Sequence, residues 1–132
     1  MKKIVILVLS TLLLTAASIQ AGAATAPLST PELKKMIGSN GKATLIFFQN
    51  PYGAPCIKQK EILGTLLKSR QGNFNIADVS TLNKNDHKAF YDYGVRSLPS
   101  LVLVDKKGNI GRVFSPGIQS AETLTAALDG AK

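Results

Sequence analysis

Cysteine is almost absent from this sequence, because Cys56 is the only one among 132 residues. A single thiol excludes an internal disulfide, so the stability of the fold must come from packing. Histidine is equally scarce, since His87 stands alone, and a metal site built from several histidines is therefore excluded. The sequence predicts no bound metal and no cofactor.

Acidic residues are also few, with 8 Asp+Glu against 16 Lys+Arg and a formal net charge of +8. The basic residues are scattered along the chain. They form no clustered run interleaved with aromatic side chains, which is the pattern that indicates nucleic-acid binding. The positive charge is therefore interpreted as a solubility feature, and no nucleic-acid partner is expected.

Long apolar runs are rare, and the one near the N-terminus is typical of a secretory signal peptide. Two lysines precede the apolar run 4–14, and the small residues 21–23 form a cleavage signature. The run is shorter than the about 20 apolar residues that a membrane-spanning helix needs. We therefore expect a signal peptide over 1–23 and a mature domain over 24–132. This domain is expected in the bacterial periplasm, or fully secreted, with no membrane contact once the signal peptide is removed.

The mature chain has the length of one domain and alternates between helical and strand patterns. Helices are expected to start at 29–32 and to cover 55–69, 83–93 and 120–127, and strands to cover 43–48, 74–79, 100–104 and 110–114. The last two strands should form an antiparallel hairpin, because the turn 105–108 is too short for a parallel crossover. The sequence thus predicts an α/β fold in which helices flank both faces of a mixed central sheet.

The start of the first helix carries a cap signal. Ser29 and Thr30 offer hydroxyl groups, Pro31 suits the first helical position, and Glu32 stands three residues after Ser29, as in a capping box.

Three separated motifs carry a resemblance to a known family. They are Phe47-Phe48-Gln49-Asn50-Pro51-Tyr52-Gly53-Ala54-Pro55-Cys56, Tyr93-Gly94-Val95-Arg96-Ser97-Leu98-Pro99-Ser100-Leu101, and Ser115-Pro116-Gly117. Each is weak alone, but their order and spacing resemble the thioredoxin family from about residue 31 to residue 131. The resemblance implies a thioredoxin fold, a cis peptide bond before Pro99, and Gly53 in the place of the first of the two active-site cysteines.

The resemblance also implies what the site has lost. In the family, the first cysteine attacks a substrate disulfide and the second resolves the mixed disulfide. Gly53 has no side chain, so this chain alone cannot cycle between dithiol and disulfide. Phe47 stands where many thioredoxins have a buried acidic residue, which further argues against efficient dithiol catalysis.

Two opposed effects act on the remaining thiol, Cys56. The start of a helix favours a thiolate, whereas burial disfavours it. The sequence leaves open whether Cys56 is reactive or a buried, inert residue.

The part of the site that binds peptide is better preserved. By the resemblance, Leu98 offers its backbone to an extended substrate strand beside Pro99, and Tyr52 takes the place of a tryptophan as an aromatic platform or as half-buried packing. The expected substrate-binding residues are Tyr52, Gly53, Ala54, Pro55, Leu98, Pro99 and Gly117.

Two functions from different classes follow. The leading hypothesis is a periplasmic protein of thiol-disulfide metabolism in which Cys56 is the catalytic thiol and forms mixed disulfides with a partner protein or a low-molecular-weight thiol. The alternative is a non-catalytic binding or chaperone-like module that holds an extended peptide beside Pro99. A third interpretation is that Gly53 replaces a natural cysteine, which would make the loop an ordinary Cys-Ala-Pro-Cys.

Overall fold

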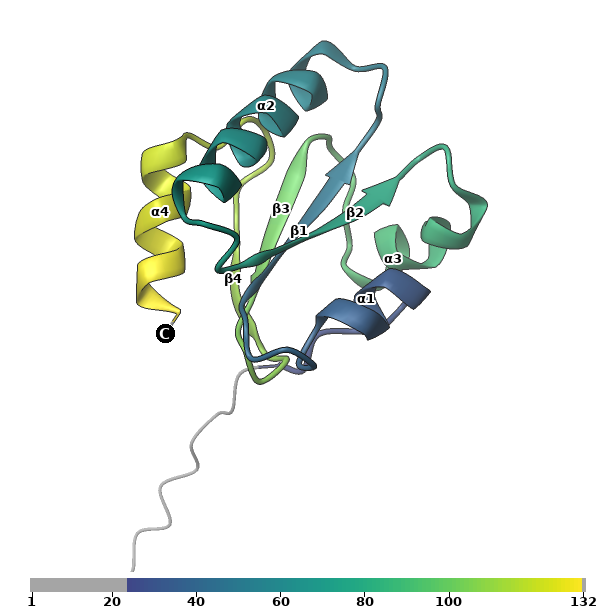
Figure 1. Ribbon diagram of the computed structural model, residues 1–132. Coiled ribbons are helices and arrows are strands. Elements are labelled where there is room, and N and C mark those ends of the chain that lie inside the picture. Colours follow the sequence, from purple (N-terminus) through teal and green to yellow (C-terminus); the bar gives the residue numbers. More distant parts are fainter. Residues whose placement is uncertain (1–23, 132) are drawn as a thin grey trace, which may run out of the picture.

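A computed structural model describes residues 24–131 (Figure 1). The expected signal peptide, 1–23, lies outside the described residues. The elements in chain order are α1 (Pro31–Met36), β1 (Thr44–Gln49), α2 (Ala54–Ser69), β2 (Asn75–Ser80), the 3-10 turn η1 (Lys84–Asp86), α3 (His87–Asp92), β3 (Ser100–Val104), β4 (Ile110–Val113) and α4 (Ala121–Gly130). Within 24–131, no helix is long and apolar enough to cross a membrane.

The four strands form one mixed sheet in the order β2-β1-β3-β4. The β1 strand pairs in parallel with β2 and antiparallel with β3, and β3 and β4 form the expected antiparallel hairpin. Every residue of β1 and β3 is buried, which explains why both strands read as continuous apolar runs in the sequence. Helices α2 and α4 cover one face and α1 and α3 the other (Figure 1). The predicted α/β architecture is confirmed.

Two hydrophobic cores lie on the two faces of the sheet. Because successive side chains of a strand point to opposite faces, Leu45 and Phe47 enter the core under α2 and α4, whereas Ile46 and Phe48 enter the core on the α1 and α3 side. The first core also contains Cys56. The sheet thereby places β1 directly beneath the helix that carries the thiol.

Two helices differ in detail from the sequence prediction. The α1 cap is Thr30, whose hydroxyl accepts a hydrogen bond from the Leu33 N–H at 3.1 Å. Ser29 does not take part in a capping box with Glu32, because its hydroxyl donates to Asp92 on α3 at 2.5 Å. The helix expected over 83–93 is divided into η1 and α3.

The segment before α1 is fastened to the end of α3. The hydroxyl of Tyr93 donates to the Pro27 carbonyl at 2.7 Å. Burial, followed by the charge of Asp92, raises the pKa of Tyr93 to about 12. Hydrogen bonds from Lys88 and then Ser29 hold the pKa of Asp92 below its ordinary value. The bonds from Tyr93 to Pro27 and from Ser29 to Asp92 join residues more than 60 positions apart in the chain.

Candidate functional site

The loop between β1 and α2 presents the start of α2 at one end of the sheet. The Asn50 side chain accepts a hydrogen bond from the Tyr52 N–H at 3.1 Å, and the Asn50 carbonyl accepts one from the Gly53 N–H at 2.9 Å. Gly53 is the N-cap residue of α2, and no side chain caps this helix. Pro55 lies in the first turn, where a missing N–H costs little. Cys56 is therefore the third residue of α2 and lies in its first helical turn.

The Cys56 thiol is free and buried, with 2 % of the residue exposed. It shares the core on the α2 side with Phe47 and Leu63, and Leu98 packs against the same core. Of the two possibilities that the sequence leaves open, burial is the one found in this structure. Gly53, three residues earlier at the start of the helix, is half-buried and carries no side chain.

Gly53 leaves open space for a side chain beside this sulfur. A Cβ atom added at Gly53 would lie 3.8 Å from Cys56 Sγ and 3.4 Å from the Asn50 carbonyl oxygen. The φ angle of −77° is one that any residue adopts. The backbone at position 53 therefore admits a side chain in van der Waals contact with Cys56 Sγ.

Pro99 and Gly117 lie next to each other at the same end of the sheet. The Leu98–Pro99 peptide bond is cis, and Phe48 at the end of β1 pairs with Ser100 at the start of β3. The Gly117 N–H donates to the Pro99 carbonyl at 2.9 Å. Gly117 has a φ of 113°, which L side chains rarely adopt. The β4–α4 loop is thus joined to the loop that carries Pro99.

Three exposed apolar side chains flank these residues along the chain. Tyr52 precedes Gly53 and is 81 % exposed, Ile57 follows Cys56 and is 48 % exposed, and Ile118 follows Gly117 and is 47 % exposed. Tyr52 therefore does not pack half-buried in its loop. Ile57 and Ile118 were missed by the sequence analysis, although an apolar residue directly after a site residue was a usable signal.

We call this surface the Pro99 face. Its members are Tyr52, Gly53, Ala54, Pro55, Ile57, Leu98, Pro99, Gly117 and Ile118. Among the expected residues, Gly53 lies beside Cys56, Leu98 packs against the core that contains Cys56, and Gly117 is hydrogen-bonded to Pro99. Ala54 and Pro55 are exposed in the first turn of α2.

Comparison with known proteins agrees with this geometry. A family model described as a thioredoxin-like domain matches residues 31–132. The chain belongs to this family. None of the curated proteins matches the chain.

Solved structures show the same fold. A thioredoxin-like protein from Clostridium perfringens is 22% identical with a TM-score of 0.66, and the match covers 89% of this chain and 90% of that one. MTB DsbF, solved in mixed oxidized and reduced forms, is 19% identical with a TM-score of 0.59 over 70% of this chain and 82% of that one. Fasciola hepatica thioredoxin is 21% identical with a TM-score of 0.59 over 70% and 83%.

One further residue of this thioredoxin-like domain, Gln59 of α2, was not among the residues that the sequence analysis expected in the site. Gln59 is fully buried. Its Oε1 accepts a hydrogen bond from the Gln119 N–H at 2.6 Å, and its Nε2 donates to the Gln119 carbonyl at 3.1 Å. Gln59 therefore connects α2 to the β4–α4 loop, which carries Gly117 and Ile118.

An acidic residue does occur near the position of Phe47, but on the neighbouring strand. Asp78 of β2 pairs directly with Phe47 and accepts a hydrogen bond from the Gln49 side chain at 2.6 Å. Since β2 is the edge strand of the sheet, the exposed position of Asp78 explains a carboxylate in an apolar strand. The charge of Asp78 also acts on Glu32 of α1. Burial, followed by the charge of Asp78, raises the pKa of Glu32 above its ordinary value.

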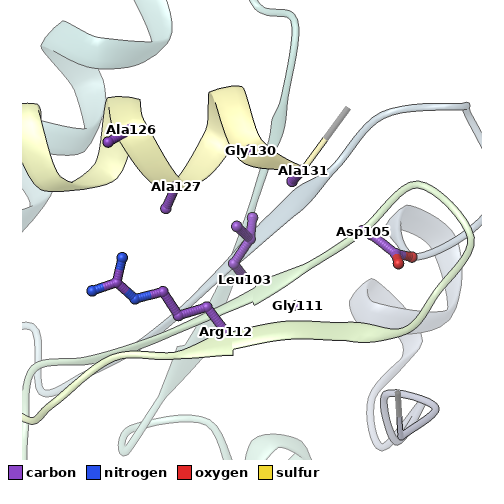
Figure 2. Close-up of a pocket in the computed structure, with 8 residues that line it drawn as sticks. All are labelled: Leu103, Asp105, Gly111, Arg112, Ala126, Ala127, Gly130 and Ala131. Carbon is purple, nitrogen blue, oxygen red and sulfur yellow. The ribbon is translucent and has the colours of Figure 1, made fainter. Parts of the chain in front are cut away.

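One hollow, of about 360 Å³, lies between α4 and the β3–β4 hairpin (Figure 2). Another, of about 180 Å³, is lined by residues on both sides of Pro99, among them Ser97 and Ser100. Neither is lined by Gly53 or Cys56. Residues 24–131 contain no group of three side chains suited to a metal ion, and His87 is exposed.

Proposed function

We propose that this thioredoxin-like protein works in thiol-disulfide metabolism in the bacterial periplasm. It binds an extended segment of a partner protein at the Pro99 face, and Cys56 forms a mixed disulfide with that partner or with a low-molecular-weight thiol. The observation that carries the proposal is the position of Gly53. Gly53 carries no side chain, and Cys56 Sγ lies 3.8 Å from the point that its Cβ would occupy.

The exchange step balances without a second cysteine in this chain. The Cys56 thiolate attacks one sulfur of a partner disulfide, which forms a new S–S bond and releases the other sulfur as a thiolate. A thiol of the partner, or a low-molecular-weight thiol, then attacks the mixed disulfide and restores Cys56. The two steps together transfer the disulfide bond to the resolving thiol, and full reduction of the partner requires a second equivalent of low-molecular-weight thiol, which leaves as a disulfide.

The Pro99 face supplies the binding part of the proposal. By the family resemblance, Leu98 offers backbone groups to an extended peptide beside Pro99, which is a form of β-strand addition. Tyr52, Ile57 and Ile118 add exposed apolar surface next to Gly53, Cys56 and Gly117 in the chain. Apolar side chains of an extended segment would bury part of this surface and hold the partner sulfur over Gly53.

A second candidate function is favoured by the burial of Cys56, which is 2 % exposed. A thiol that solvent does not reach reacts slowly. The protein would then be a peptide-binding or chaperone-like module that has lost its redox cycle, with Cys56 as a small core residue.

The rate of Cys56 alkylation by N-ethylmaleimide separates these two functions. The thiol-exchange proposal predicts that N-ethylmaleimide labels Cys56 in the folded protein, because a thiol that exchanges with a partner disulfide must be accessible. Gly53→Ala is the matched control, because the added methyl group covers the sulfur and should slow labelling at least tenfold. Labelling that occurs only after denaturation, in both proteins, would sink the redox proposal and leave the binding module.

A further inference from the structure

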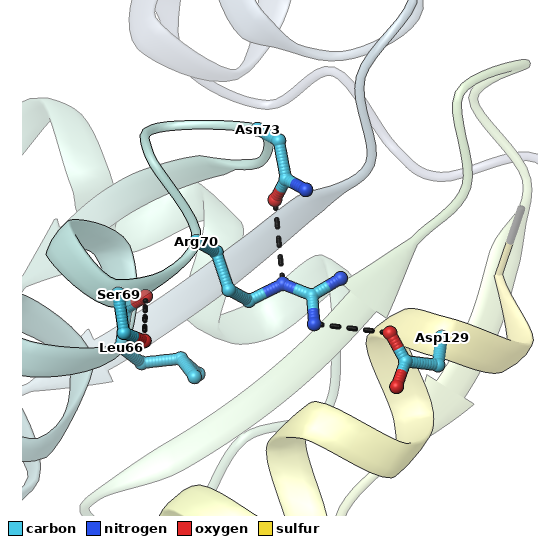
Figure 3. A network of polar contacts seen from close by, with 5 residues as sticks. All are labelled: Leu66, Ser69, Arg70, Asn73 and Asp129. Carbon is cyan, nitrogen blue, oxygen red and sulfur yellow. Dashed lines mark hydrogen bonds and ion pairs between the residues drawn. The ribbon is translucent and has the colours of Figure 1, made fainter.

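The helices α2 and α4 are connected by side chains at both ends of their contact. At the start, the Gln59 amide makes two hydrogen bonds with the Gln119 backbone just before α4. At the far end, Arg70 binds Asp129 near the end of α4, with Nη1 and Oδ1 3.0 Å apart (Figure 3). Only the first connection adjoins the Pro99 face.

The two connections differ in burial and chemistry. Gln59 is fully buried and neutral, whereas the Asp129 side chain is 53 % exposed and takes part in an ion pair. Gln59 binds backbone atoms, so its effect does not depend on the Gln119 side chain, which instead donates to the Ser115 carbonyl at 2.8 Å. Arg70 also donates to Asn73 at 3.3 Å (Figure 3).

A glutamine at a buried helix position lowers the stability of the fold unless its amide is hydrogen-bonded. Burying a side-chain amide has a free-energy cost unless its donor and acceptor are both satisfied, and a leucine would fill the same volume without that cost. Both groups of Gln59 are satisfied here by one residue that is 60 positions away. Buried polar contacts of this kind specify one arrangement of the elements that they join.

The elements joined by Gln59 are α2 and the β4–α4 loop, and this loop contributes Gly117 and Ile118 to the Pro99 face. The loop is held at Gly117, whose N–H donates to the Pro99 carbonyl, and again at Gln119 by Gln59. Ile118, 47 % exposed, lies between these two attachment points. Its side chain therefore has a defined position relative to the helix that carries Cys56.

We propose that Gln59 is a positioning residue of the Pro99 face, which holds Gly117 and Ile118 in register with α2 and so determines how tightly an extended apolar peptide binds. The inference deepens the proposed function, because it rests on peptide binding at this face. It does not depend on the reactivity of Cys56.

Amide hydrogen exchange of Gly117 tests the positioning role without any ligand. In Gln59→Leu, the Gly117 amide should exchange at least tenfold faster, while the Phe47 amide in the central strand keeps its ratio to global unfolding. In Asp129→Asn, which removes the charge of the ion pair at the other end, Gly117 should exchange within twofold of wild type. If Gln59→Leu raises the exchange rates of the Gly117 and Phe47 amides by the same factor, Gln59 has only a structural role. The same holds if it changes neither rate. Gln59→Met, which is unbranched and flexible, replaces the leucine variant if that does not fold.

Peptide affinity is the second measurement. The probe is a disulfide-linked dimer of an extended apolar pentapeptide that contains one cysteine, tested on Cys56→Ala backgrounds so that only non-covalent binding counts. We expect Gln59→Leu to raise the Kd at least fivefold and Asp129→Asn to leave it unchanged. Equal Kd values in all three proteins would overturn the inference. If wild type binds no probe, the proposed function fails, whereas the exchange rate of Gly117 still reports on Gln59 alone.

Discussion

Gly53 lies against Cys56 so closely that a Cβ atom on it would stand 3.8 Å from the sulfur. The backbone there has an ordinary φ of −77°, and the contact with the Asn50 carbonyl oxygen, at 3.4 Å, is ordinary van der Waals distance. The backbone at the start of α2 thus accommodates a second side chain next to Cys56, and position 53 supplies none. This relationship sets the first prediction.

Gly53→Cys should form a reversible disulfide with Cys56. The new thiol would stand at the N-cap position of α2, where backbone N–H groups favour a thiolate. The measurements are the number of free thiols per chain before and after treatment with dithiothreitol, and the rate at which the reduced protein reduces a chromogenic disulfide reagent. Gly53→Ser is the control, since it adds a polar side chain but no sulfur. Two free thiols that persist under air oxidation would show that the two positions do not meet.

Gly117→Ala should lower the free energy of unfolding by about 1 to 3 kcal/mol, because its φ of 113° is one that L side chains rarely adopt. The open space around this position excludes a steric clash as the cause, since a Cβ would meet nothing within 4 Å. Denaturant titration measures the change. Gly130→Ala is the control: the same open space surrounds it, it lies in α4 without a positive φ, and alanine there should be neutral or stabilising.

Tyr93→Phe should cost about 1 kcal/mol at neutral pH, because the hydrogen bond to the Pro27 carbonyl at 2.7 Å is lost. The pKa of Tyr93 is raised to about 12 from 10.0, so this group stabilises the fold fully below pH 10 and less as the pH rises through 12. The stability difference between wild type and Tyr93→Phe should therefore shrink above pH 10. Tyr91→Phe, at a side chain that is 87 % exposed, should show neither effect in the same urea titrations.

Glu32→Gln should gain stability relative to wild type as the pH rises from about 4 to 7. Burial and the nearby charge of Asp78 raise the pKa of Glu32 above 4.5. A carboxyl with a raised pKa stabilises the folded state when it is protonated, and that contribution is lost as the pH rises through its folded-state pKa. The effect should be a few tenths of a kcal/mol, since the group is partly solvated. Thermal melts at several pH values measure it, and a difference that does not vary with pH would contradict the assignment.

The sequence analysis located each strand within one residue and identified the thioredoxin-like fold. This success has a local cause: the apolar runs of β1 and β3 are long enough to specify buried strands, and the motifs at Gly53, Pro99 and Gly117 each occupy one short segment. The exposure of Tyr52 and Ile118, in contrast, depends on how loops from different parts of the chain surround one another.

The contacts that were missed join distant parts of the chain. The bonds between Gln59 and Gln119 span 60 positions, and the bond from Ser29 to Asp92 spans 63. A glutamine on the apolar face of a helix gives no indication of its partner, and Ser29 satisfies the pattern of a local cap while its hydroxyl is used elsewhere. Periodicity reports which face is buried but not which groups meet there.

The different chemistry of the two connections between α2 and α4 has a consequence for the response to salt. Ion pairs at a surface weaken as salt screens them, whereas a neutral amide paired with backbone is far less sensitive. The ion pair between Arg70 and Asp129 should therefore weaken at high ionic strength, while the hydrogen bonds between Gln59 and Gln119 are retained. Roughly 21 Å of helix separates Cys56 from Arg70. The domain can thus loosen at one end in response to ionic conditions while the end that carries the thiol keeps its shape.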